Sequence, residues 1–130
     1  MDRTATTARG LTAASVMLSA VVHLELWAQG MSSVAFVGPA FLANAVGGLL
    51  IALAVLLWDH WLPLLASIGF GMATFGAFVV STTVGLFGVH EQWRGAAVWL
   101  SAVSEIAAIV FALVALVAMR RVRPRQLLRP

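Results

Sequence analysis

The sequence contains no cysteine and very little charge. The missing cysteines exclude disulfide bonds, thiolate metal sites and thiol redox chemistry. Only 10% of the 130 residues are Asp, Glu, Lys or Arg, whereas soluble domains carry about 25% of charged residues. Such a chain cannot cover itself with polar surface, and 62% of its residues are apolar. The composition therefore indicates an integral membrane protein.

Four long segments are almost free of charge, at about residues 10–28, 40–58, 64–89 and 95–119. A helix needs about 20 apolar residues to cross the hydrocarbon core of a bilayer, and short connections favour antiparallel neighbours. We therefore predict an all-α integral membrane protein, an antiparallel four-transmembrane-helix bundle that forms one membrane domain over residues 1–130. The first segment also fits a signal peptide, but no clear small-x-small cleavage site follows it, so we favour an uncleaved span.

Arginine is concentrated at the two ends of the chain. Two Arg precede the first span, five lie in a basic tail at 120–130, and Arg94 alone lies in a connection. Because positive residues stay on the cytoplasmic side, this predicts a multi-pass protein of the cell membrane with both termini cytoplasmic. Tryptophan gathers at membrane interfaces and agrees with this topology. The outer set would be Trp27, Trp93 and Trp99, and the inner set Trp58 and Trp61.

Small residues follow one face of two spans, where they would allow close helix packing in lipid. The third span has Gly69, Ala73, Ala77, Ser81 and Gly85 at every fourth position. The fourth span has Ala97, Ser101, Glu105, Ala108, Ala112 and Ala115, so we expect Glu105 on a packing face. The partner of the third-span ridge is either a helix of this chain or a second chain, which makes a homo-oligomer plausible.

Each span also carries a polar or ionisable side chain at a similar depth in the outer half. Counting 1.5 Å per residue from the nearest interfacial marker places His23, Asn44, residues 81–83 and Glu105 about 6–10 Å inside that interface. Ionisable groups at such depth are costly and are functional candidates by default. An imidazole and a carboxylate at one depth can share a proton, form an ion pair or ligate a metal, so His23 and Glu105 are the predicted central pair.

Further polar residues would surround the outward mouth of this layer. His23 and Glu25 are about 200° apart around one helix, so Glu25 is expected at the rim or toward a neighbouring subunit. Each residue also fits a structural role, as a hydrogen-bonded core group or part of a solvated loop. The predicted ligand-binding residues are His23, Glu25, Asn44, Thr82, Glu105, His90 and Glu91, and the predicted metal ligands are His23, Glu105 and His90.

Three functions stay open. The first is an outward-opening site for a proton, a transition metal such as Zn, Cu(II) or Fe(II), or a small ligand. The second is an accessory subunit of a larger membrane complex, such as a respiratory complex, with the basic tail against anionic lipid or a cytoplasmic partner. The third is a redox protein linked to a quinone, or to haem with His23 and His90 as axial ligands. Nothing in the sequence indicates a nucleic-acid surface or a nucleophilic triad, and catalysis is left undecided.

The segment from Phe41 to Leu50 is rich in glycine and alanine and is followed by a Leu/Ala run. With the span count and the chain length, it resembles the DoxX-like small four-helix membrane proteins. The resemblance covers the architecture and about 20 residues and implies a membrane redox role. The carboxylate usual in this second-span position is replaced by Asn44, so the resemblance assigns no catalytic residue to this chain.

Overall fold

The computed structural model describes residues 2–126, with the side chains of residues 2–121. This part of the chain forms the helices α1 (Arg3–Ala28), α2 (Val37–Leu57), α3 (Leu62–Thr83) and α4 (Ala96–Gln126), with a short 3-10 helix η1 (Met31–Ser33) after α1. All four α-helices are long and apolar enough to cross a membrane. The prediction of an all-α bundle with four candidate spans is therefore confirmed.

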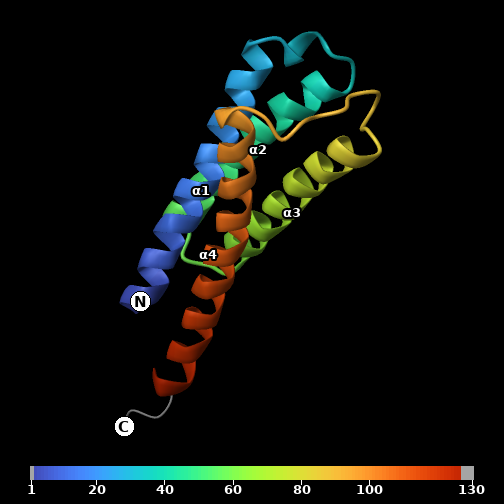
Figure 1. Cartoon of the computed structure of the whole chain (residues 1–130). Coiled ribbons are helices and arrows are strands. Elements are labelled where there is room, and N and C mark those ends of the chain that lie inside the picture. Colours follow the sequence, from blue (N-terminus) through green and yellow to red (C-terminus); the bar gives the residue numbers. More distant parts are fainter. Residues whose placement is uncertain (1, 127–130) are drawn as a thin grey trace.

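The four helices do not pack equally. α1 and α4 lie side by side in the middle, α2 packs on α1, and α3 packs on α4 (Figure 1). α2 and α3 contact each other much less, and the α3 ribbon leans away from α4 toward its own C-terminal end. The buried core is made mostly of alanines from α1 and α4, together with Val16, Val55 and Leu64.

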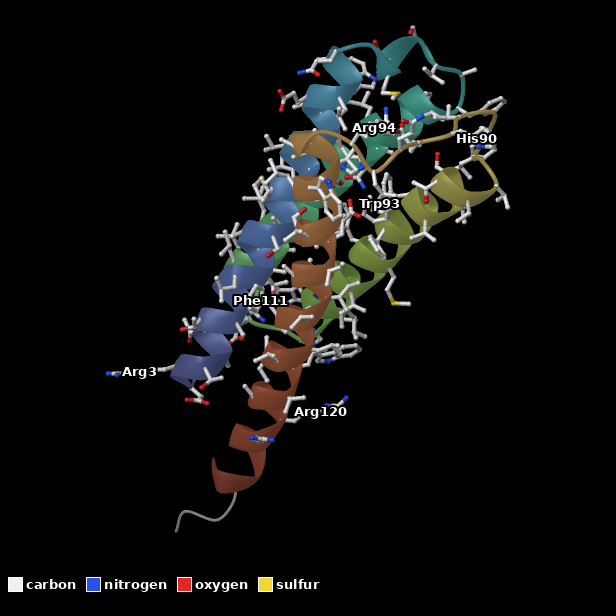
Figure 2. All side chains as sticks on the ribbon, viewed as in Figure 1. Arg3, His90, Trp93, Arg94, Phe111 and Arg120 are labelled. Carbon is white, nitrogen blue, oxygen red and sulfur yellow. The ribbon has the colours of Figure 1, made fainter. Side chains whose placement is uncertain are left out.

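The two ends of the bundle differ in character. One end, here called the terminal end, carries the start of α1, the end of α4 and the turn at residues 58–61 (Figure 1). The other, the loop end, carries residues 29–36 and the longer connection at 84–95. Figure 2 places Arg3 and Arg120 at the terminal end and His90, Trp93 and Arg94 at the loop end.

Two helix boundaries differ from the prediction. α3 ends at Thr83 rather than near residue 89, because Gly85 and Gly88 have φ values of 85° and 81° and the chain turns back through a Leu86–Val89 bridge. The left-handed region is readily accessible to glycine and stops a helix. α4 continues beyond residue 119 to Gln126, so the predicted basic tail begins as helix. Residues 127–130 of that tail lie outside the described residues.

Glycine permits the closest helix contacts. A Cβ added at Gly48 would lie 2.8 Å from the Ala20 Cβ, and one added at Gly71 would lie 2.7 Å from the backbone oxygen of Glu105. Both distances are too short for a side chain, so α1–α2 and α3–α4 approach each other through these glycines.

The small-residue ridge predicted on α3 is not the face that packs on α4. Gly69, Ala73 and Ala77 are exposed, whereas Ser67 and Gly71 are buried, and Gly71 lies against α4. Positions 69 and 71 are about 200° apart around the helix, so the ridge faces away from this contact. The expected face of α4 is confirmed, because Glu105 and the alanines at 108, 112 and 115 are all buried.

Arg9 closes the terminal end from inside. Its guanidinium donates hydrogen bonds to the carbonyl oxygens of Val55, Trp58 and His60, at the C-terminal end of α2 and in the turn that follows. These carbonyls lack helical partners, and a cation there also complements the helix dipole. The distance to the exposed Asp59 carboxylate is 4.0 Å.

Candidate functional site

A cavity of about 460 Å³ opens between α2 and α3 at the loop end. All four helices and the connection at 84–95 contribute to its lining. Its walls are mostly apolar, with Phe41 of α2, Phe70 and Phe78 of α3, and Phe87 of the connection. The polar side chains in the lining include His23, Asn44, Glu91 and Glu105. A largely apolar cavity of this size with a few convergent polar groups is typical of a small-molecule site.

Glu105 is the most deeply buried ionisable group of the cavity, with 1% of its surface exposed. Its Oε1 accepts a hydrogen bond of 2.6 Å from Ser101 Oγ, one turn earlier on α4, and one of 3.2 Å from Ser19 Oγ of α1. No described residue donates a hydrogen bond to Oε2. One carboxyl oxygen is thus fixed by two serines, and the second is left for the cavity.

His23 is buried on α1, one turn after Ser19. The carbonyl oxygen of Ser19 can only accept, so the 2.8 Å contact with His23 Nδ1 identifies Nδ1 as the protonated nitrogen. The same Nδ1 lies 3.5 Å from Ser19 Oγ, which in turn donates to Glu105. Nε2 is then left as a hydrogen-bond acceptor, beside the Phe41 ring at a centroid distance of 4.9 Å.

The predicted pair of His23 and Glu105 is therefore joined through Ser19. No ion pair links the two side chains in the part of the chain that the structure describes. A hydrogen-bonded series runs from the imidazole through the Ser19 hydroxyl to the carboxyl of Glu105. We call these residues, with Ser101, the serine relay.

Asn44 faces the same cavity from α2. Its Nδ2 donates a 2.7 Å hydrogen bond to Thr74 Oγ1, and that hydroxyl donates to the Phe70 carbonyl oxygen. Since the hydroxyl proton is already used, Thr74 must accept from Asn44, which fixes the amide orientation. Asn44 Oδ1 is buried and has no hydrogen-bond partner among the described residues.

Glu91 lies in the cavity lining through the connection that Ser81 holds in place. Ser81 Oγ donates to the Val89 carbonyl oxygen at 2.9 Å and accepts from the Glu91 backbone N–H at 3.2 Å. These two bonds tie the connection to the last turns of α3, so the Glu91 backbone is held beside the cavity rather than on a free loop.

Three of the predicted ligand-binding residues lie elsewhere. Glu25 is exposed and accepts a hydrogen bond from Gln29 on the outside of α1. Thr82 donates to the Val79 carbonyl oxygen of its own helix and does not line the cavity. His90 is exposed at the loop end, where its ring packs over Gly85 (Figure 2). The structure thus brings together His23, Asn44, Glu91 and Glu105 and leaves the other three outside.

The predicted metal set is not assembled. His90 lies outside the cavity that His23 and Glu105 share. Within the described residues, no group of three or more His, Asp or Glu side chains could hold a metal ion. The position of His90 in the sequence does not predict which way its side chain points from the connection at 84–95. His23 and His90 likewise do not face each other across a haem-sized space inside this cavity.

Sequence reasoning did not assign a site role to Ser19, Ser101 or Thr74. Ser19–His23 and Ser101–Glu105 are each four residues apart, and this spacing places both members on one helix face. That spacing is the signal that could have found the relay. The aromatic walls carry no comparable signal, because phenylalanine is common on the lipid-facing surfaces of spans.

Comparisons with protein-family models, with curated proteins and with solved structures found no match to this chain. The functional assignment therefore depends on the geometry of the cavity and the serine relay.

Proposed function

We propose that this is a multi-pass protein of the cell membrane that binds a small molecule or a proton at Glu105 and His23. The observation that carries the proposal is the position of Glu105. Its carboxyl is buried with one oxygen held by two serines, and no described residue donates a hydrogen bond to the other oxygen. A buried ionisable group with an unused oxygen beside a cavity is a functional candidate, since burying it without a use is costly.

The proposed orientation places the loop end outside the cell and the terminal end in the cytoplasm. Seven of the eight arginines lie in the first two turns of α1 or from residue 120 onward, as the positive-inside rule requires of cytoplasmic segments. The cavity then opens in the outer half of the membrane. Arg9 fills the other end of the bundle, which supports a binding site with access from one side rather than a continuous path.

The absence of cysteine makes the orientation directly testable. Single cysteines at the exposed positions Ser32, Gln92 and Thr4 leave the core untouched. In intact cells, a membrane-impermeant thiol reagent should label S32C and Q92C, and it should label T4C only after the cells are lysed. Labelling of T4C in intact cells would reverse the proposed topology.

The binding site is tested with dicyclohexylcarbodiimide, a lipid-soluble reagent that adds to carboxyl groups in apolar surroundings. We expect one adduct per chain, located by peptide mass spectrometry at Glu105. Glu105→Gln should remove it, whereas Glu25→Gln should not, because Glu25 lies outside the cavity. A chain that is labelled at Glu25 and never at Glu105 has no accessible site at the relay, and the proposal fails.

The ligand itself is sought by native mass spectrometry of the protein extracted in a mild neutral detergent. A small molecule that is retained by the wild-type chain and lost from Glu105→Gln would support the proposal. Retention of the same molecule by both chains would place it on the lipid-facing surface instead.

A second proposed role, as a subunit of a homo-oligomer or larger complex, rests on the exposed ridge of α3. A Cβ at Gly69 or Gly76 would meet no atom within 4 Å, and neither glycine belongs to the cavity lining. Small residues on an exposed face let a helix of a second chain approach closely. Gly69→Cys should then form a disulfide dimer or a defined crosslink in native membranes, and Leu49→Cys, exposed on α2, should not.

A further inference from the structure

The atoms left without partners in the cavity share one chemical property. Given the bonds of the serine relay, His23 Nε2 is an acceptor, and no described residue donates to it. Asn44 Oδ1 is a buried acceptor without a partner, and Glu105 Oε2 is an acceptor whenever the carboxyl is ionised. Buried acceptors are costly unless they receive hydrogen bonds or a positive charge. The cavity is therefore complementary to a group that donates protons or carries positive charge.

The charged residues of the lining also favour a positively charged ligand. Glu105 lies at the inner wall and Glu91 in the connection, whereas no Arg or Lys belongs to the described lining of the cavity. In a low-dielectric site, like charges repel strongly and opposite charges attract strongly. An anionic ligand such as a fatty acid would meet carboxylates without a compensating cation. A cationic ligand would meet them as counter-ions.

The aromatic walls suit a cation that carries apolar groups. The rings of Phe41, Phe70, Phe78 and Phe87 line the cavity. The face of an aromatic ring attracts a positive charge, and this attraction grows when the charge is removed from water. Most of the remaining wall is alanine, valine and leucine, and the hydroxyls of Thr74, Ser81 and Ser101 are already bonded to groups of the protein, so the lining offers few hydrogen bonds to a strongly hydrated ion. Small metal ions are thereby disfavoured relative to organic cations.

We propose that the cavity binds a lipophilic organic cation, an ammonium- or phosphonium-type group with apolar substituents, which pairs with the Glu105 carboxylate. This inference rests on the proposed function and specifies its ligand class. The same carboxyl cannot hold a proton and serve as the counter-ion at once. Where Glu105 is protonated in the empty cavity, that proton leaves through the cavity mouth to solvent as the cation binds. Where Glu105 is already ionised, the cation binds without proton release.

The pH dependence follows from the groups that face Glu105. α1 contributes His23 through Ser19, and the connection contributes Glu91. α2 and α3 contribute only the uncharged Asn44, Thr74 and Ser81 to the polar lining. Acidification protonates the Glu105 carboxyl and can add charge to His23, and each change disfavours a cation. Binding is expected to weaken as pH falls, with no described group acting in the opposite direction.

The test uses two probes of matched size and opposite charge, tetraphenylphosphonium and tetraphenylborate. Binding to the full-length protein in an uncharged detergent is measured by equilibrium dialysis, with protein-free micelles subtracted. We expect saturable binding of tetraphenylphosphonium at one per chain, weaker at pH 5 than at pH 8, and no saturable binding of tetraphenylborate. Glu105→Gln should weaken tetraphenylphosphonium binding at least about tenfold, while Glu25→Gln should leave it unchanged.

A second variant protects the test against a folding defect in Glu105→Gln. Ala77 lines the cavity from α3 without joining the serine relay, so Ala77→Trp should fill the space and block the probe in a chain with an intact relay. Equal binding of both probes, or binding that neither Glu105→Gln nor Ala77→Trp weakens, would overturn the cation assignment. If, in addition, dicyclohexylcarbodiimide fails to reach Glu105, the proposed site fails as well. If it still reaches Glu105, only the ligand class is wrong.

Discussion

The rings of Phe36 and Phe87 stack on each other with their centroids 5.5 Å apart, and both residues have a positive φ. Phe36 precedes α2 and Phe87 lies in the connection between α3 and α4, so the stack joins the two loops of the loop end. Among the described residues, these two are the non-glycine residues with positive φ, at 64° and 49°. A bulky residue in this region is strained, and such strain gathers at sites of ligand binding and motion.

The stack lies where the cavity reaches the loop end, since Phe87 is part of the cavity lining. Both rings are largely exposed, so their contact is not forced by a surrounding core. We therefore interpret the Phe36–Phe87 stack as a cover for the cavity that can open at low cost, because an aromatic contact of this kind contributes about 0.5–1.5 kcal/mol.

The first prediction concerns this cover. Phe36→Ala and Phe36→Gly both remove the stack and should speed labelling of Glu105 by dicyclohexylcarbodiimide several-fold. The glycine variant should be the more stable of the two by about 1 kcal/mol, because glycine adopts positive φ without strain. Labelling rates come from mass spectrometry and stability from denaturation in mixed micelles. Leu53→Ala, an exposed change on α2, serves as the control, and an equal rate increase there would count against a cover.

The second prediction concerns the serine relay. Ser19→Ala removes a donor to Glu105 and the link to His23, and loss of a hydrogen bond to a buried carboxyl should lower the free energy of unfolding by about 1–3 kcal/mol. The same change should weaken tetraphenylphosphonium binding, because Glu105 is then less firmly positioned. Ser15→Ala is the matched control on the preceding turn, where the hydroxyl bonds only to its own helix at Leu11. If the two variants lose equal stability and affinity, the relay has no special role.

The sequence was sufficient for the helices and for the shared level of His23 and Glu105 along the bundle. Long charge-free segments predict spans whatever their packing, and counting residues from interfacial markers places His23 and Glu105 at one level. In the structure both residues contact Ser19. His23 contacts its carbonyl oxygen, and Glu105 accepts a hydrogen bond from its hydroxyl. Helical periodicity alone predicts that each serine lies beside its ionisable partner. Ser19 and His23 share one face of α1, and Ser101 and Glu105 share one face of α4.

The sequence was insufficient where the outcome depends on contacts between distant segments. The small-residue pattern of α3 is visible in the sequence, but it does not say which face meets α4, and the contact is made through Gly71 instead of Gly69. The apolar composition also continues past Thr83, whereas the helix ends there because of backbone angles at two glycines. The side-chain direction of His90 was not predictable either, because a loop has no regular periodicity along the sequence.

The third prediction tests the α3–α4 contact with two glycines of the same helix. Gly71→Ala would place a Cβ 2.7 Å from the backbone oxygen of Glu105, so the helices must separate, at a cost of about 1–3 kcal/mol of stability. Gly69→Ala meets open space and should stabilise the helix by up to about 1 kcal/mol, since alanine is the better helix former. Denaturation in mixed micelles measures both. A destabilising Gly69→Ala would instead show that the exposed ridge is occupied by a second chain.

Arg9 illustrates how a charge that marks topology also holds the fold together, and it supports the last prediction. The position near the chain start predicts a cytoplasmic residue, but the guanidinium is buried and bonded to carbonyls 46 to 51 residues away along the chain. Arg9→Gln keeps part of the side-chain volume but removes the donors to the Val55 and His60 carbonyls, which should cost about 2–3 kcal/mol. Arg3→Gln removes the same charge from an exposed position and should cost less than about 0.5 kcal/mol.

Asp59→Asn should also be nearly neutral, because the carboxylate is exposed and 4.0 Å from Arg9. If Asp59→Asn were as damaging as Arg9→Gln, the ion pair and not the carbonyl cap would hold the terminal end closed.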